Sequence, residues 1–110
     1  MACGYSQIPG VDFTESYAPV IHDVTWRLLL LNKLMNKHHA IVIDVKFAFL
    51  HGELEEDIFM ECPEGLQNSE DECLLLNKAL YGLVQAARQY YLKFISALWK
   101  IGFTGGDADP

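Results

Sequence analysis

Cysteine is scarce in this chain, and its 3 cysteines form no recognisable metal or disulfide pattern. Cys3, Cys62 and Cys73 are widely spaced, with no Cys-x-x-Cys pair and no Cys-His spacing of the kind that binds zinc. An odd number of thiols without a framework is typical of a reducing compartment. We therefore expect an intracellular protein, either cytoplasmic or nuclear.

Long apolar segments and a leader pattern are also missing. Unbroken apolar runs such as Leu28–Leu31 and Phe47–Leu50 are much shorter than the roughly 20 residues that a membrane-spanning helix needs. The N-terminal residues Met1–Tyr5 lack a charged stretch followed by an apolar core, so no signal peptide is expected. These absences predict a soluble protein with no membrane partner.

Basic residues are few, because 8 Lys and Arg stand against 15 Asp and Glu and the formal net charge is −7. Such a field repels nucleic acid, so weak or no nucleic-acid binding is expected of this polypeptide by itself. The acidic side chains gather at 53–57 and 70–72, as solvated turns do. Hydrophobic residues make up 51% of the 110 residues, which is enough for the core of one domain or part of one.

Several common catalytic patterns are absent. The sequence has no P-loop, no Gly-x-Gly-x-x-Gly and no Gly-x-Ser-x-Gly, and its 4 histidines include no His-x-x-x-His pair. Histidine is therefore read as a surface or turn residue, and glycine as a turn residue.

Two helices are predicted, the first from its Leu-rich composition and length and the second from its apolar periodicity. The first runs from Val24 to about Lys37, with Asp23 as its N-cap and an apolar arc wide enough to be well buried. The second runs from Val84 to Ile101 and ends at Gly102. Its expected apolar face is Ala87, Tyr91, Phe94, Leu98 and Ile101, and its expected polar face is Gln89, Lys93, Ser96 and Lys100.

Short β-branched or apolar runs predict strands. Ala40–Val45 suits a central strand covered on both faces, Ile58–Glu61 a second strand after the turn at His51-Gly52, and Cys73–Leu76 a third. Residues 1–20 and 104–110 are rich in glycine and proline or polar residues and read as loops. The fold class is therefore α+β, with helices packed on a small, largely antiparallel sheet.

A lone carboxylate, Asp44, follows the apolar run Ala40–Ile43, where desolvating it would cost several kcal/mol. It could be a cap or turn residue, or a Mg²⁺ ligand with the carbonyl of Val45 as a second oxygen. Nucleotidyl transfer requires carboxylates that hold two cations roughly 3.5–4 Å apart, which one aspartate cannot do. The nearby Glu53, Glu55, Glu56 and Asp57 follow a turn and are expected to face water.

Aromatic residues also have two readings. Tyr81-Gly82 is either a tight turn or a place where a ligand approaches the backbone closely. The helical spacing of Tyr90, Tyr91, Phe94 and Trp99 favours a core role over a base-stacking platform, because few basic residues lie beside them.

Several blocks in this order resemble the reverse transcriptase domain of Ty1/copia-type retrotransposons. Gly10–Val20 and Trp26–Leu30 resemble its opening segment, and Asp44–Gly52 with Leu54–Glu56 resembles its first catalytic motif and the following turn. Later blocks are matched by Phe59–Gly65, Leu80–Gln89, Gly102–Phe103 and Ala108–Pro110. An unrelated α+β domain would require all of these matches to be coincidences.

The resemblance implies a right-hand polymerase, of which residues 1–110 would be part of the fingers and the first part of the palm, truncated at both ends. The implied activity is RNA-directed DNA polymerisation by a transposable element, a deoxynucleotidyl transfer that uses Mg²⁺, an RNA or DNA template-primer and dNTPs. Asp44 would be the first metal-binding aspartate, with Val45 beside it. Phe49 would crowd the 2′ position of the sugar, and Tyr81 and Gly82 would lie beside the incoming nucleotide and template.

Departures from the family pattern predict that this polypeptide is inactive by itself. The family's second aspartate pair lies in a Tyr-x-Asp-Asp motif, which this sequence does not contain. Cys3 stands where the family usually has lysine, Phe47 where it has a small polar residue, Ala87 where it has proline and Tyr90 where it has tryptophan. The alternative is a non-catalytic binding or interaction module that self-associates through an exposed sheet edge.

Overall fold

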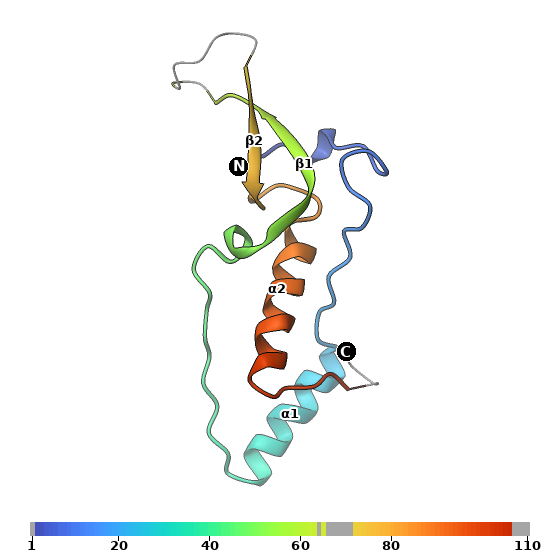
Figure 1. Cartoon of the computed structure of the whole chain (residues 1–110). Coiled ribbons are helices and arrows are strands. Elements are labelled where there is room, and N and C mark those ends of the chain that lie inside the picture. Colours follow the sequence, from blue (N-terminus) through green and yellow to red (C-terminus); the bar gives the residue numbers. More distant parts are fainter. Residues whose placement is uncertain (1, 64, 66–71, 107–110) are drawn as a thin grey trace.

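The computed structural model describes residues 2–63, 65 and 72–106 (Figure 1). Its regular elements are the helices α1 (Asp23–Met35) and α2 (Ala86–Lys100) and the strands β1 (Glu53–Glu61) and β2 (Cys73–Lys78). Two short 3₁₀ turns, η1 (Gly4–Ser6) and η2 (Ala48–His51), precede α1 and β1. This is a small α+β arrangement, as the sequence predicts.

The sheet consists of β1 and β2, which pair antiparallel. Ile58 lies opposite Leu76, Glu61 lies opposite Cys73, and the register is irregular between Glu53 and Ile58. The strands predicted at 58–61 and 73–76 are therefore confirmed, and both extend further. Glu53, Glu55 and Asp57 lie in β1 rather than in a turn, and they are exposed as expected, whereas Glu56 is half-buried.

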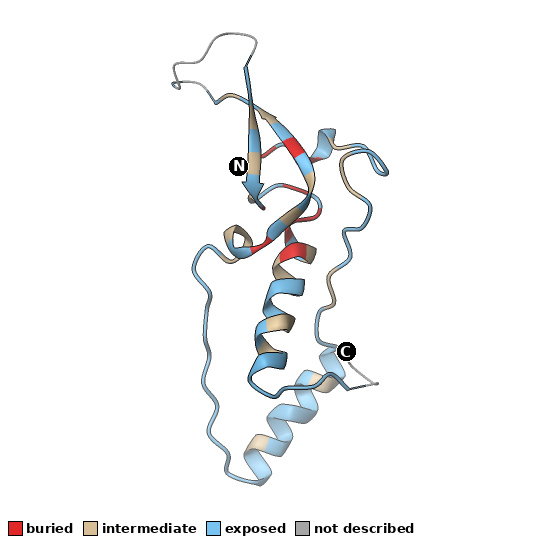
Figure 2. Ribbon diagram, viewed as in Figure 1, coloured by how far each residue is buried: buried red, intermediate tan, exposed pale blue. Residues whose placement is uncertain are grey.

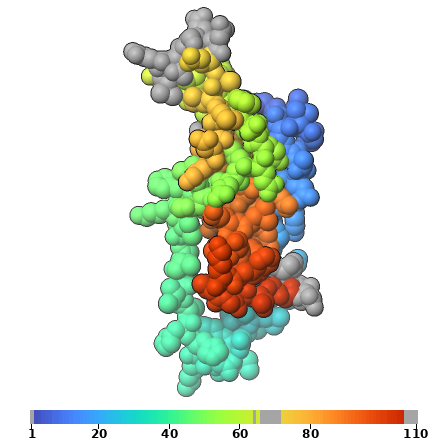
Figure 3. Space-filling model, in the orientation of Figure 1, coloured from blue at the N-terminus to red at the C-terminus, as the bar shows by residue number. Residues whose placement is uncertain are grey.

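The central strand predicted at Ala40–Val45 is wrong. Residues 38–45 have no regular structure, and Ile41, Val42 and Ile43 are 86%, 93% and 77% exposed. Figure 3 shows this segment along one edge of the molecule. A central strand must pair on both sides and be covered on both faces, and among the described strands β1 and β2 pair only with each other.

Helix α1 forms where it is expected but is not buried. It has no buried residue, and even Leu28 to Leu31 are 41–60% exposed, so the wide apolar arc finds too little to pack against. Its N-cap is His22, so the prediction that Asp23 is the N-cap is wrong. Asp23 instead lies in the first turn, where a carboxylate is favoured by the helix dipole, and it pairs with Arg27 at 2.7 Å.

Helix α2 ends as its sequence predicts. Gly102 adopts a φ of +96°, and its N–H donates to the carbonyl of Trp99 at 3.1 Å. The N–H of Phe103 donates to the carbonyl of Leu98, also at 3.1 Å. These two bonds form the Schellman motif, which satisfies the last carbonyls of the helix and favours glycine at the left-handed position.

The predicted faces of α2 are wrong at their most important positions. Gln89, expected on the polar face, is buried, whereas Phe94 and Ile101, expected on the apolar face, are exposed. The helix contacts η2 and β1 through its N-terminal part, where Ala86 and Gln89 are its buried residues. The face in contact is therefore set by the elements around it rather than by hydrophobicity alone.

The core is small and lies where the N-terminal segment, the sheet and the start of α2 meet (Figure 2). Its buried hydrophobic residues are Ala2, Ile58, Ala79, Leu83 and Ala86. The molecule measures 62 × 29 × 26 Å, and its radius of gyration is 18.4 Å, whereas a compact domain of this length has about 13 Å. Much of the apolar surface is therefore left uncovered.

Candidate functional site

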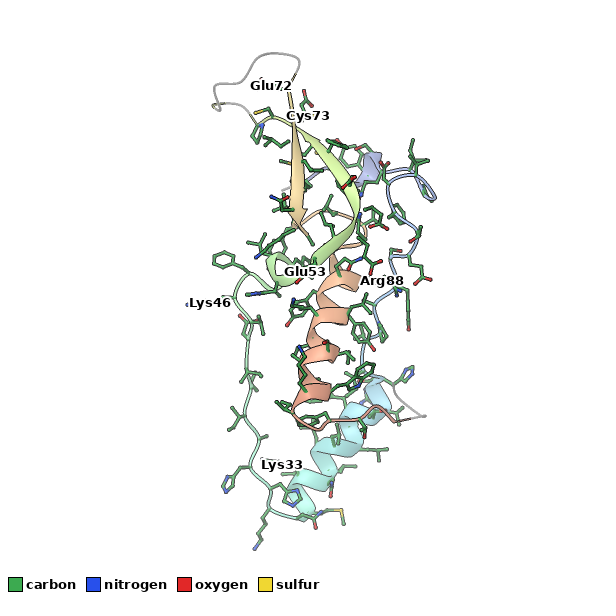
Figure 4. All side chains as sticks on the ribbon, in the orientation of Figure 1. Lys33, Lys46, Glu53, Glu72, Cys73 and Arg88 are labelled. Atoms are coloured by element: carbon green, nitrogen blue, oxygen red, sulfur yellow. The ribbon has the colours of Figure 1, made fainter. Side chains whose placement is uncertain are left out.

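Asp44 lies on the extended segment between α1 and η2, and its side chain is exposed. It makes no side-chain hydrogen bond or ion pair within the described part of the chain. The N-cap of η2 is Phe47, so Asp44 is not a cap. Lys46 on the same segment points outward from it in Figure 4. Among the described residues, no hydrogen bond or ion pair therefore accounts for a carboxylate at this position.

The chain turns sharply after this segment. Phe47 has a φ of +54°, a left-handed conformation that is uncommon for residues with a Cβ. Its carbonyl accepts from the N–H of Leu50 at 2.9 Å, and the carbonyl of Phe49 accepts from Gly52 at 3.0 Å. This turn brings Phe49 back toward the start of α2.

Phe49 packs among aromatic rings from two later parts of the chain. Its ring centroid is 4.7 Å from that of Tyr81 and 6.4 Å from that of Tyr90, which in turn stacks on Phe94 at 5.9 Å. The structure thus brings Phe49 and Tyr81 together, and both are candidate site residues from the sequence. Tyr90 is half-buried, and the core role predicted for Trp99 is wrong because that side chain is 65% exposed.

The Tyr81-Gly82 pair forms a tight turn. The N–H of Leu83 donates to the carbonyl of Leu80 at 3.3 Å, and Gly82 in the third position of the turn has a φ of +102°. A residue with a Cβ is strained there, which explains the glycine. The turn reading is confirmed, and both turn residues remain exposed enough to meet a ligand.

Sequence reasoning missed Gln85, which has no exposed surface. Its Oε1 accepts from Nε2 of Gln7 at 3.0 Å, and its Nε2 donates to the carbonyl of Asp12 at 3.2 Å. The one available signal was an uncharged polar residue between Val84 and Ala86, where a buried amide must find partners. Its partners are distant in the sequence and could not be identified from it.

Ion pairs join other segments to α2. Arg88, near the start of α2 in Figure 4, pairs with Glu15 and donates to the carbonyl of Tyr17 at 3.4 Å. Lys93 donates a hydrogen bond to Glu53, and this bond and the positive charge lower the pKa of the Glu53 carboxyl from its usual value. Glu15 and Glu53 are thus each paired with a basic residue of α2.

The described residues do not form a two-cation site by themselves. Within residues 2–63, 65 and 72–106, no group of three His, Cys, Asp or Glu side chains is placed to hold a metal ion. Asp44 therefore belongs to no such group among the described residues, and the carbonyl of Val45 follows it directly in the chain. No described helix is both long and apolar enough to cross a bilayer.

An apolar cavity of about 550 Å³ lies beside the aromatic cluster. Its wall combines Phe49, residues of α2 and residues near the start of α1. The lining residues are Ala18, Pro19, Ile21, Thr25, Leu29, Phe49, Ala87, Tyr90, Tyr91, Phe94 and Ile95.

Comparison with known proteins identifies the class. Residues 1–109 match the family described as reverse transcriptase (RNA-dependent DNA polymerase), so the chain belongs to that family. The chain is 40% identical over 109 residues to the Retrovirus-related Pol polyprotein from transposon TNT 1-94 of Nicotiana tabacum, covering 97% of this chain. It is 36% identical over 111 residues to that from transposon RE1 of Arabidopsis thaliana, covering 99% of this chain.

The relatives are Ty1/copia-type Pol polyproteins, as the resemblance predicts, and they include the Transposon Ty1-BL Gag-Pol polyprotein of Saccharomyces cerevisiae at 27% identity over 100 residues. The chain spans 8% of the length of the tobacco and Arabidopsis polyproteins, and 6% of the yeast one. No solved structure matches the chain.

Proposed function

We propose that the chain supplies part of the fingers and the first part of the palm of an RNA-directed DNA polymerase. The observation that carries this proposal is the contact between Phe49 and Tyr81, whose centroids are 4.7 Å apart. Two blocks of the family, separate in sequence, thus supply neighbouring aromatic side chains. In the complete enzyme, Phe49 would meet the deoxyribose, and Tyr81 and Gly82 the incoming nucleotide and template.

In that enzyme Asp44 and the carbonyl of Val45 would supply oxygen ligands for Mg²⁺. Exposure and the absence of a partner within the described residues support this role, because the carboxylate is available. The remaining acidic ligands would come from residues outside this polypeptide, which contains no Tyr-x-Asp-Asp sequence. Template-primer would likewise be held mainly by other parts of the enzyme, because this chain carries a net charge of −7.

The 110-residue polypeptide by itself is inactive in this proposal, because two-cation catalysis lacks its other acidic ligands. A primer-extension assay tests this with the purified chain, poly(rA)–oligo(dT), dTTP and Mg²⁺, beside an active reverse transcriptase as positive control. No incorporation is expected. Template-dependent incorporation that disappears in Asp44→Asn would contradict the inactivity and place a complete site in this chain.

A second function is favoured by one observation, the exposure of Ile41, Val42 and Ile43 at 77–93%. An extended apolar segment that pairs with neither described strand invites another strand, so the polypeptide could act as a non-catalytic module that self-associates. Light scattering at increasing concentration tests this. A mass above that of the 12.5 kDa monomer, lowered by Val42→Lys, supports self-association, and a monomer throughout excludes it.

A further inference from the structure

The N-terminal segment Ala2–Asp12 lies directly against the Tyr81-Gly82 turn. The N–H of Ala2 donates to the carbonyl of Tyr81 at 2.8 Å. A Cβ on Gly4 would lie 1.9 Å from the carbonyl oxygen of Gly82, so only glycine permits this approach of the two backbones. The turn thus contacts a segment that is far from it in the sequence, at the N-terminal end of the chain.

Gln7 continues this contact on the far side of the turn. Its Oε1 accepts from the backbone N–H of Val84 at 2.8 Å, and its Nε2 donates to Oε1 of Gln85 at 3.0 Å. Gln85 in turn donates to the carbonyl of Asp12 at 3.2 Å. Both functional atoms of both amides are therefore used, and they join Val84 and Gln85, the two residues that follow the turn, to the N-terminal segment.

We propose that Gln7 is a positioning residue for the Tyr81-Gly82 turn, acting through Val84 and Gln85. This inference rests on the proposed function, in which that turn meets the nucleotide and template. Gln7 contacts neither of them. It fixes where the turn stands relative to Phe49, whose ring contacts Tyr81.

The chemistry of the two amides supports positioning rather than general packing. Gln85 is fully buried, so loss of its partner leaves a buried polar atom unsatisfied, which costs more than the bond itself contributes. Among the residues that the structure describes, the side-chain bonds of Gln7 go to Val84 and Gln85 alone, directly after the turn. Its removal should therefore loosen the turn before it loosens the body of α2.

Amide hydrogen exchange of the ¹⁵N-labelled chain tests the proposal. The reporter is the N–H of Leu83, which bonds to Leu80 within the turn and does not touch Gln7. The reference is the N–H of Ile95, inside α2. Gln7→Leu keeps the side-chain volume and removes both bonds, and we expect exchange at Leu83 to rise roughly tenfold while exchange at Ile95 is unchanged.

Two further variants sharpen the result. Gln7→Glu can still accept from Val84 but, when ionised, cannot donate to Gln85, so its effect on Leu83 should fall between wild type and Gln7→Leu. Thr14→Val is the matched control, because it removes a side-chain bond from the same N-terminal part of the chain to Glu56. Thr14→Val should leave the rate of amide exchange at Leu83 unchanged. If Gln7→Leu does not fold, Gln7→Glu decides the question.

The proposal is overturned if exchange at Leu83 does not change, or if Leu83 and Ile95 accelerate together. Addition of millimolar Mg²⁺–dTTP to the wild-type chain tests the proposed nucleotide role of the turn separately from the positioning role of Gln7. Shifts of the Tyr81 and Gly82 amide signals support the nucleotide role, and shifts that shrink in Gln7→Leu but not in Thr14→Val support positioning. No shift in wild type counts against the nucleotide role alone, since the exchange comparison needs no nucleotide.

Discussion

The ring of Phe49 packs on the ring of Tyr81, with centroids 4.7 Å apart and planes inclined by 39°. One ring comes from η2 and the other from the turn before α2, so the contact fixes two loops relative to each other. Asp44 lies in the segment just before η2. The Phe49–Tyr81 pair therefore joins the segment that follows Asp44 to the turn that precedes α2.

Removing the ring of Phe49 should destabilise the chain. Phe49 is half-buried against Tyr81 and Tyr90, so Phe49→Ala is expected to lower the free energy of unfolding by about 1–2 kcal/mol, less than for a fully buried ring. Urea unfolding measures this. Phe103→Ala is the control, because that ring is 61% exposed, and it should change stability by less than about 0.5 kcal/mol. Equal effects would show that the aromatic cluster contributes nothing specific.

A Cβ at Gly52 should push α2 away from the sheet. It would lie 2.9 Å from the backbone nitrogen of Tyr90 and 3.0 Å from the carbonyl carbon of Gln89, and neither backbone atom can move by itself. Gly52→Ala is expected to cost about 1–3 kcal/mol of unfolding free energy, in the range of overpacked cores. Thermal unfolding followed by circular dichroism measures the loss.

Gly105→Ala is the matched control for that experiment. A Cβ on Gly105 would meet nothing within 4 Å, so the variant should unfold at the wild-type temperature. If Gly52→Ala also unfolded at that temperature, the close approach of Gly52 to α2 would be wrong.

The helices and strands could be predicted because their signals are local. Each signal lies within one short stretch of the sequence: the Leu-rich run of α1, the apolar periodicity of α2 with the glycine after it, and the apolar runs of β1 and β2. Pairing is not local. Ala40–Val45 has the composition of a central strand, yet no described strand lies beside it, so it remains exposed.

The candidate site could be predicted in part for the same reason. The family blocks indicated Phe49 and Tyr81 separately, and only the fold shows that they touch. The roles of Gln7 and Gln85 depend on a bond between residues far apart in sequence. No spacing rule relates them, and their amide chemistry states only that buried partners are needed.

The ion pair between Glu53 and Lys93 should make stability depend on pH. Lys93 lowers the pKa of Glu53 below its ordinary value of 4.5, so the stabilisation is present above pH 4.5 and is lost as the pH falls through the lowered pKa of the folded chain. NMR titration should show the pKa of Glu53 returning toward 4.5 in Lys93→Met. The two chains should differ in stability above pH 4.5 and converge in acid.

Lys100→Met is the control for the pH experiment, because it removes a charge from the same helix at a residue that does not pair with Glu53. It should leave the pKa of Glu53 low. A pKa that returns toward 4.5 in both variants would assign the effect to the total charge of α2 rather than to the pair.

Asp44→Asn should separate stability from function. The carboxylate is exposed and makes no hydrogen bond or ion pair within the described residues. The free energy of unfolding of the variant is therefore expected to lie within about 0.5 kcal/mol of the wild-type value. In a polymerase that contains this segment, the same substitution should abolish primer extension, because a Mg²⁺ ligand is lost. Primer extension at the wild-type rate with unchanged stability would remove Asp44 from the catalytic site. A large loss of stability would instead assign it a structural role.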